Sequence, residues 1–251
     1  MGKIYKQIGI YSKKLFLYLP LLFGVSILLM DIIAFLAPIL AHFGYKDLAH
    51  IIYFVYKFLC HQRPWRSIHL FDYQTAWCTR DTFIYLSMAL ASFLVVKFNI
   101  RKVKWYIPIV VTIPFALDGT IQFIAELSGL LRGDNVFFYA STNFIRMLTG
   151  SLFGAGIGIW LFGLLYDTIR EEFEFNLKKS KKSNHEISYQ NKINPIIFIF
   201  IIVIVCFISY IFLVRLWDVT SSKYKPYGLL DHMRYFPGVN YENTGSRGHA
   251  I

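Results

Sequence analysis

The chain has 251 residues, of which 56% are hydrophobic and 16% are charged, and its mean hydropathy is +0.47. A soluble domain of this length cannot hide so much apolar surface in one core, so the composition excludes an ordinary soluble protein and indicates an integral membrane protein. The formal net charge of +11 does not predict a nucleic-acid partner, because most Lys and Arg residues flank apolar runs and act there as topology determinants. The expected partner is the lipid bilayer.

Five apolar runs meet or approach the length of about 20 residues that a membrane-spanning helix requires. They cover residues 15–43, 82–98, 105–126, 143–166 and 195–217. None of them shows the strict polar and apolar alternation of a barrel strand, so the runs favour helices. We therefore predict an all-α fold, a polytopic membrane bundle of about five transmembrane helices. Its single domain covers residues 1–217, and residues 218–251 form an extracytoplasmic tail.

The segment between the first two runs contains an apolar stretch, residues 48–59, that is too short to cross a bilayer. This stretch predicts one short interfacial or re-entrant helix. Pro64 disfavours helix in the residue before it, so a non-helical loop should follow and lead back to the second run near Asp81. Residues 170–194 are rich in Lys, Glu, Ser and Asn and predict a solvated linker.

Lys and Arg residues are concentrated in three segments: before the first run, in residues 97–104 and in residues 170–192. In a five-span arrangement these segments share one side of the membrane. Because segments rich in Lys and Arg stay in the cytoplasm, the pattern predicts an inside N-terminus and an outside C-terminus in the cell membrane. The first run is too long for the core of a signal peptide, so we expect it to be a retained anchor.

The third apolar run carries Asp118, Gln122 and Glu126 at intervals of four residues, which places them on one face of a helix. A carboxylate buried in hydrocarbon costs several kcal/mol unless it is paired, so this face should point into protein or water. Three such residues on one face favour a functional site. For any one of them, an interhelical hydrogen bond that only holds the bundle together is the alternative interpretation.

The fourth run carries Asn143, Arg146 and Gly150 on one face, which Gly154 and Gly158 continue as a ridge for close helix packing. An always-charged guanidinium on such a face requires an anion or several acceptors. We predict one buried polar cluster in which the Asp118 carboxylate pairs with Arg146 and acts as general acid or base. The candidate catalytic residues of this cluster are Asp118, Gln122, Asn143 and Arg146.

The loop before the second run falls on the same predicted outer side and carries four residues of metal-ligating type: Cys60, His61, Cys78 and Asp81. Such residues bind zinc or another borderline divalent metal. Two cysteines on the extracytoplasmic side can instead form a disulfide that ties the loop, and the sequence leaves both interpretations open, ahead of free thiols. Three arginines of the loop predict a positive rim for an anionic ligand: Arg63, Arg66 and Arg80.

These motifs resemble those of the prokaryotic membrane proteins grouped as domain of unknown function 2085. The resemblance covers roughly residues 55–160 and is carried by four elements: Cys60-His61-Gln62-Arg63-Pro64-Trp65-Arg66-Ser67, Cys78-Thr79-Arg80-Asp81-Thr82-Phe83-Ile84-Tyr85, Asp118-Gly119-x-x-Gln122 and Asn143-x-x-Arg146-x-x-x-Gly150. It implies a multi-helix protein of the prokaryotic cell membrane and supplies no activity. In the second element Asp81 and Phe83 replace a Cys and a Gly of the family pattern, so a site of three cysteines is not available, although Asp81 could ligate a metal through oxygen.

Two functions follow from these expectations. In the first, the chain is a membrane-embedded enzyme that acts at the outer leaflet on a lipid or on an anionic lipid-linked group. In the second, it is a non-catalytic transport or assembly subunit with a disulfide-stapled loop, within a homo-oligomer or a larger membrane complex. The sequence contains neither a nucleotide-binding glycine loop nor a serine-hydrolase elbow.

Overall fold

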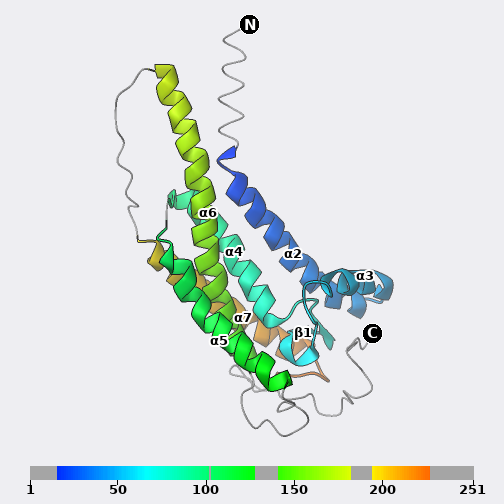
Figure 1. Cartoon of the computed structure of the whole chain (residues 1–251). Helices are drawn as coiled ribbons and strands as arrows, with labels where there is room; N and C mark the ends of the chain where they lie inside the picture. The colour runs from blue at the N-terminus through cyan, green and yellow to red at the C-terminus, as the bar shows by residue number, and fades with distance from the viewer. Residues whose placement is uncertain (1–15, 102, 128–140, 182–193, 227–251) are drawn as a thin grey trace.

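The computed structural model describes residues 16–101, 103–127, 141–181 and 194–226. Its elements, in chain order, are α2 (Leu19–His42), α3 (Lys46–Tyr56), the 3-10 turn η1 (Pro64–Arg66), β1 (His69–Leu70), β2 (Tyr73–Gln74), α4 (Thr79–Phe98), α5 (Tyr106–Leu127), α6 (Asn143–Lys181) and α7 (Pro195–Thr220), as drawn in Figure 1. Five of these helices, α2, α4, α5, α6 and α7, are long and apolar enough to cross a membrane. The predicted all-α membrane bundle is confirmed.

Each of the five predicted runs corresponds to one spanning helix, but the boundaries differ most at α6. This helix continues to Lys181, so the first half of the segment interpreted as a solvated linker is helical. Glu, Lys and Arg are strong helix formers and no Pro or Gly interrupts them there, so the helix continues beyond its apolar part. The predicted tail lies largely outside the described residues, which end at residue 226.

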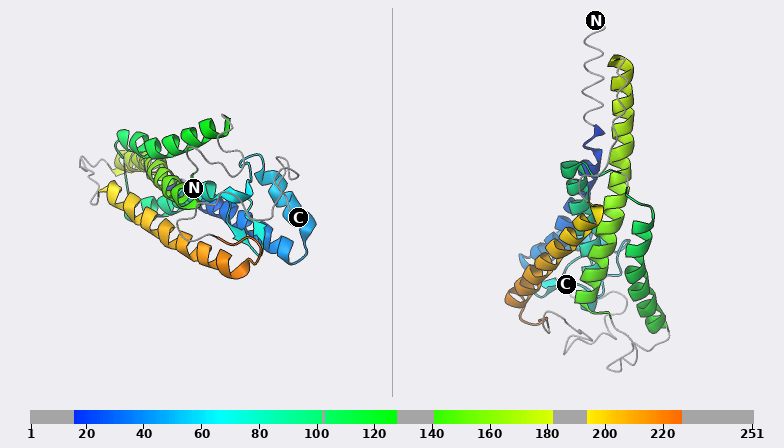
Figure 2. Two further views of the ribbon diagram at one scale, coloured as in Figure 1. Left: turned by 90° about the horizontal axis from the view of Figure 1, so that it is seen from below. Right: turned by 90° about the vertical axis from the view of Figure 1, so that its left-hand side faces the viewer.

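Helix α6 is the centre of the bundle, and its glycine ridge packs against α4. A Cβ atom at Gly154 would lie 2.3 Å from the carbonyl oxygen of Ile84, and one at Gly150 would lie 2.7 Å from that of Arg80. Only glycine lets the two backbones approach so closely, as the G-x-x-x-G spacing predicts. On another face of α6, Gly156 makes room for Val111 of α5. Helices α5 and α7 lie on opposite sides of α6 (Figure 2).

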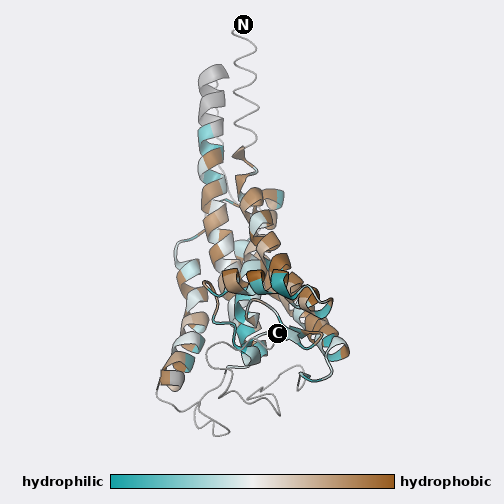
Figure 3. Ribbon diagram, turned by 90° about the vertical axis from the view of Figure 1, so that its right-hand side faces the viewer, coloured by the Kyte–Doolittle hydropathy of each residue, from teal (hydrophilic) through white to brown (hydrophobic). Residues whose placement is uncertain are grey.

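The buried apolar residues form two clusters. The larger cluster joins α4, α6 and α7 around Phe83, Met147 and Tyr210. The smaller one joins α2 and α3 to the start of α4 around Tyr53 and Trp77. The outward faces of α2, α5 and α7 expose large apolar side chains, as expected for helices that contact lipid. Figure 3 shows this apolar colour along the middle of the helices and polar residues gathered at the end where α4 begins.

A two-residue hairpin closes the loop between α3 and α4. Strands β1 and β2 pair antiparallel, and the connecting Phe71 and Asp72 both have positive φ, which suits the twist of a tight hairpin. Asp72 anchors this hairpin to the end of α7, because its carboxylate accepts hydrogen bonds from the backbone N–H groups of residues 222, 223 and 224. Partial burial acts to raise the pKa of Asp72, but these hydrogen bonds outweigh it and hold that pKa below its ordinary value.

Candidate functional site

A cavity of about 220 Å³ lies at the end of the bundle where α4 begins. Its walls come from the loop after α3, the first turn of α4 and the facing sides of α5 and α6. The lining residues are Leu59, Cys60, His61, Gln62, Arg63, Arg66, Cys78, Arg80, Asp81, Phe115, Gln122 and Arg146. The three arginines of the predicted rim and the arginine of the predicted cluster therefore share one cavity, together with all four residues of the predicted metal site.

Gln62 shapes the loop that forms one wall of the cavity. Its backbone has a φ of 49°, and its side-chain Nε2 donates hydrogen bonds to the carbonyl oxygens of Tyr53 (2.8 Å) and Ala76 (3.1 Å). The end of α3 and the segment leading into α4 are thus held by one buried side chain. Cys60, four residues after the end of α3, is in this way placed beside Cys78, which precedes the first residue of α4.

Two arginines of the cavity bind one amide. With its oxygen turned toward the arginines, Gln122 of α5 accepts hydrogen bonds from Arg146 of α6 (2.7 Å) and from Arg66 of η1 (3.0 Å). Arg146 also donates to Oδ1 of Asn143 (3.3 Å) and to the carbonyl oxygen of Trp65 (3.4 Å). Burial, followed by the positive charges of Arg146 and Arg63, lowers the pKa of Arg66 to about 9. The cavity therefore concentrates positive charge.

Asp118 is paired differently from the sequence-based prediction. Its carboxylate forms an ion pair with Arg80 of α4 and accepts a hydrogen bond from the hydroxyl of Ser141 at 3.1 Å. We expected Arg146 to be its partner and Arg80 to lie on the rim. Arg80 takes that place because it stands in the first turn of α4, where the missing side chains of Gly119 and Gly150 leave room for it.

The predicted polar cluster is nevertheless present at this end of the bundle. Each of its four members is at most 5% exposed. Asn143 links the cluster to α4, because its Oδ1 accepts a hydrogen bond from the hydroxyl of Thr79 at 3.2 Å. The third residue of the predicted α5 face, Glu126, has a side chain outside the described part of the structure.

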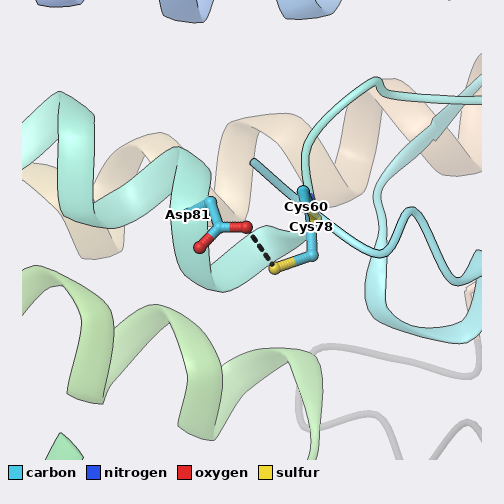
Figure 4. A group of neighbouring side chains, drawn as sticks. All are labelled: Cys60, Cys78 and Asp81. Atoms are coloured by element: carbon cyan, nitrogen blue, oxygen red, sulfur yellow. Dashed lines mark hydrogen bonds between the residues drawn. The ribbon is translucent and has the colours of Figure 1, made fainter. Parts of the chain in front are cut away.

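Cys60, Cys78 and Asp81 form a compact group of possible metal ligands. Their sulfur and oxygen atoms lie within 4.8 Å of one another, and Figure 4 shows the Cys78 thiol directed at the Asp81 carboxylate, at 3.1 Å from Oδ2. Both cysteines are free thiols in the structure. The neighbouring Cys78 and then burial raise the pKa of the Cys60 thiol. His61 lines the same cavity but lies outside this group, so the four-residue ligand set reduces to three.

One buried acidic residue was not singled out by the sequence reasoning. Asp31 of α2 is 4% exposed, and within the described residues both of its carboxylate oxygens lack a hydrogen-bond partner. The signal was available, because Asp31 is the only charged residue of α2 and stands in the middle of an apolar run. It is not among the residues that line the cavity.

The fold and the site define a multi-span membrane protein with a buried polar cluster at one end of its helices. The family model of predicted membrane proteins known as domain of unknown function 2085 matches residues 60–160, which include every residue of the cavity except Leu59. The chain is also 30% identical over 160 residues to an uncharacterized protein of Methanocaldococcus jannaschii, a match that covers 60% of this chain and 94% of that relative. The chain belongs to this family, as its motifs indicated. No solved structure matches it.

Proposed function

We propose that this protein binds an anionic, phosphate-type group in the arginine-lined cavity at the extracytoplasmic end of its bundle. The observation that carries the proposal is the convergence of four guanidinium groups, from the loop, η1, α4 and α6, on one cavity in which Asp81 is the one carboxylate among the described lining residues. Guanidinium groups form two parallel hydrogen bonds to phosphate or carboxylate oxygens, so they are the side chains best suited to such a ligand.

Electrostatics support the same ligand. Burial is the main cause of the lowered pKa of Arg66, and the repulsion from Arg146 and Arg63 adds to it. A bound anion would relieve this repulsion and would be held where water screens it poorly. The Asp118 carboxylate does not line the cavity and is bound by Arg80, so it fits the role of a residue that positions Arg80 better than that of a general acid or base.

Position and size favour the headgroup of a lipid or of a lipid-linked substrate. The cavity lies at the end of three spanning helices, α4, α5 and α6, where headgroups meet the protein, and its volume suits a phosphate-sized group without an acyl chain. Alongside it, α3 exposes Ile51, Phe54 and Val55, an apolar face on which a chain attached to that headgroup could lie. An enzyme acting on such a lipid at the outer leaflet and a non-catalytic subunit that binds it would share this cavity.

Thermal unfolding of the purified protein in detergent tests the proposal. Inorganic phosphate should raise the unfolding midpoint of the wild type, because a ligand that binds only the folded state stabilises it by mass action. Arg66→Gln and Arg146→Gln should lose most of this shift. Arg215→Gln, at an exposed position of α7, is the matched control and should keep it.

A second measurement, of stabilisation by lipid vesicles, distinguishes a lipid headgroup from a soluble anion as the ligand. Vesicles of anionic phosphatidylglycerol should stabilise the wild type more than vesicles of neutral phosphatidylcholine if the ligand is a lipid headgroup, whereas stabilisation by inorganic phosphate alone indicates a soluble ligand. Equal phosphate-dependent shifts in Arg146→Gln and Arg215→Gln, with both variants folded, would contradict the proposal.

A further inference from the structure

We infer that Cys60, Cys78 and Asp81 bind a divalent cation of the zinc type and leave one coordination position open toward the arginine-lined cavity. Their donor atoms lie within 4.8 Å of one another. In a tetrahedral site with metal–sulfur bonds of about 2.3 Å, two sulfur ligands stand about 3.8 Å apart, so side-chain movements of about 1 Å would bring the group to coordination distance. The Cys78 sulfur and the Asp81 oxygen, at 3.1 Å, are already close enough.

The local fold explains why these three side chains meet. Cys78 and Asp81 are three residues apart across the start of α4, and this spacing puts both side chains on one side of its first turn. Cys60 reaches them because the backbone N–H of Cys78 donates a hydrogen bond to its sulfur at 3.3 Å. Hydrogen bonds of this kind to a ligand sulfur orient it and are typical of the outer shell of metal sites.

The ligand types favour zinc over magnesium or calcium. Thiolates select borderline and soft metals, whereas magnesium and calcium require oxygen ligands throughout. A disulfide would use the same two sulfurs, but it gives no role to the carboxylate placed against one of them. The third donor is the reason for preferring a cation to a disulfide.

Three protein ligands are the pattern of a zinc site that keeps one position for water or substrate, whereas structural zinc sites are closed by four. Within the described residues, His61 is the remaining zinc-ligating side chain in the cavity lining, and it lies outside the group. All three ligands line the cavity that Arg66 and Arg146 also line, so the open position would face those arginines. This last step rests on the proposed function: one oxygen of a bound anion would meet the metal while the guanidinium groups bind the others.

Metal content measures the site directly. We expect about one zinc ion per chain in protein purified without chelator and with a mild reductant. Cys78→Ser and Asp81→Asn should each lower the zinc content at least tenfold, whereas Cys206→Ser, a buried free cysteine of α7, should leave it unchanged. Cobalt(II) added to the chelated protein should give the intense absorption of thiolate-to-cobalt charge transfer in the wild type and in Cys206→Ser, and not in the double variant Cys60→Ser/Cys78→Ser.

Size-exclusion chromatography of each variant shows whether it is folded. If the cysteine variants aggregate, the zinc content of Asp81→Asn, which keeps both sulfurs, still tests the site. The inference is wrong if zinc-supplemented wild type binds no metal, if the double variant binds as much metal as Cys206→Ser, or if thiol labelling of the wild type shows Cys60 and Cys78 joined in a disulfide. Arg146→Gln should keep its zinc and lose its response to phosphate, so failure of the metal site and failure of the anion site are separate results.

Discussion

Arg80 shows how a single residue in this bundle connects two polar systems. Its guanidinium forms the ion pair with Asp118, lies over the ring of Phe115 at 5.6 Å and lines the same cavity as the thiols. In a low-dielectric interior a charged pair of this kind roughly balances its desolvation cost, but either partner alone is expensive. The Arg80–Asp118 pair is therefore expected to hold the Arg80 guanidinium at the cavity more than to raise the net stability of the fold.

Removing one partner of the Arg80–Asp118 pair should cost more than removing both. We expect Asp118→Asn alone to lower the free energy of unfolding by about 3 kcal/mol, because the Arg80 charge is left without its carboxylate. Adding Arg80→Gln should recover most of that loss. Thermal unfolding in detergent of the two single variants and the double variant measures the coupling. Strictly additive effects would show that the two side chains do not interact.

At the scale of elements, the contact between α4 and α6 positions the site. Helix α4, which begins directly after Cys78, carries Arg80 and Asp81, helix α6 carries Asn143 and Arg146, and glycine brings the two backbones close. Any side chain on the ridge that forces the helices apart would also separate these groups. We therefore predict that packing in the middle of the bundle affects the binding of the proposed ligand at its end.

Gly154→Ala should destabilise the bundle, while Gly163→Ala should not. A Cβ atom at Gly154 would lie 2.1 Å from the Ser87 hydroxyl and 2.3 Å from the Ile84 carbonyl oxygen, whereas one at Gly163 would meet Val103 at 3.6 Å, an ordinary contact. Overpacking of this kind costs about 1–3 kcal/mol. Both glycines lie inside α6, so the gain in helix propensity is the same and the difference in unfolding midpoint isolates the contact. Equal midpoints would mean that the ridge is not a close contact.

For the whole molecule, the arrangement of the spanning helices puts α3, the hairpin and the start of α4 at one end and the long extension of α6 at the other (Figure 1). The cavity lies at the first of these ends. The buried ion pair between Arg101 and Asp167, at 3.2 Å, joins α6 to the connection between α4 and α5 near that second end. We predict that the end opposite the cavity faces the cytoplasm, because Lys97, Arg101 and Lys104 lie in or beside the connection between α4 and α5 at that end.

Reporter fusions should place the cavity outside the cytoplasm. A reporter active only in the cytoplasm should work when fused at the N-terminus and fail at the C-terminus, and a reporter active only outside should show the reverse. A cysteine introduced for Glu171, in the part of α6 beyond its apolar run, should be inaccessible to an impermeant thiol reagent in intact cells. Labelling of that cysteine from outside would reverse the orientation and move the cavity into the cytoplasm.

The sequence by itself determined the membrane class, the five spanning helices, the family and most of the residues that line the cavity. These follow from local properties: a run of apolar side chains must span lipid as a helix, and a charged residue within it must find a partner. Spacing along one helix also determined which residues share a face, and the buried positions of Asp118, Gln122, Asn143 and Arg146 agree with it.

Only the tertiary structure decided which residues meet. The rotation of each helix about its axis and the path of the loop are set by packing, so the sequence could not show that Asp118 pairs with Arg80 instead of Arg146. His61 is adjacent to Cys60 in the sequence but lies outside the group that Cys60 forms with Cys78 and Asp81, which no spacing rule predicts. Helix α6 ends later than the sequence predicted for a related reason. Hydropathy indicates where the lipid ends, but a helix ends only where its backbone hydrogen bonds stop.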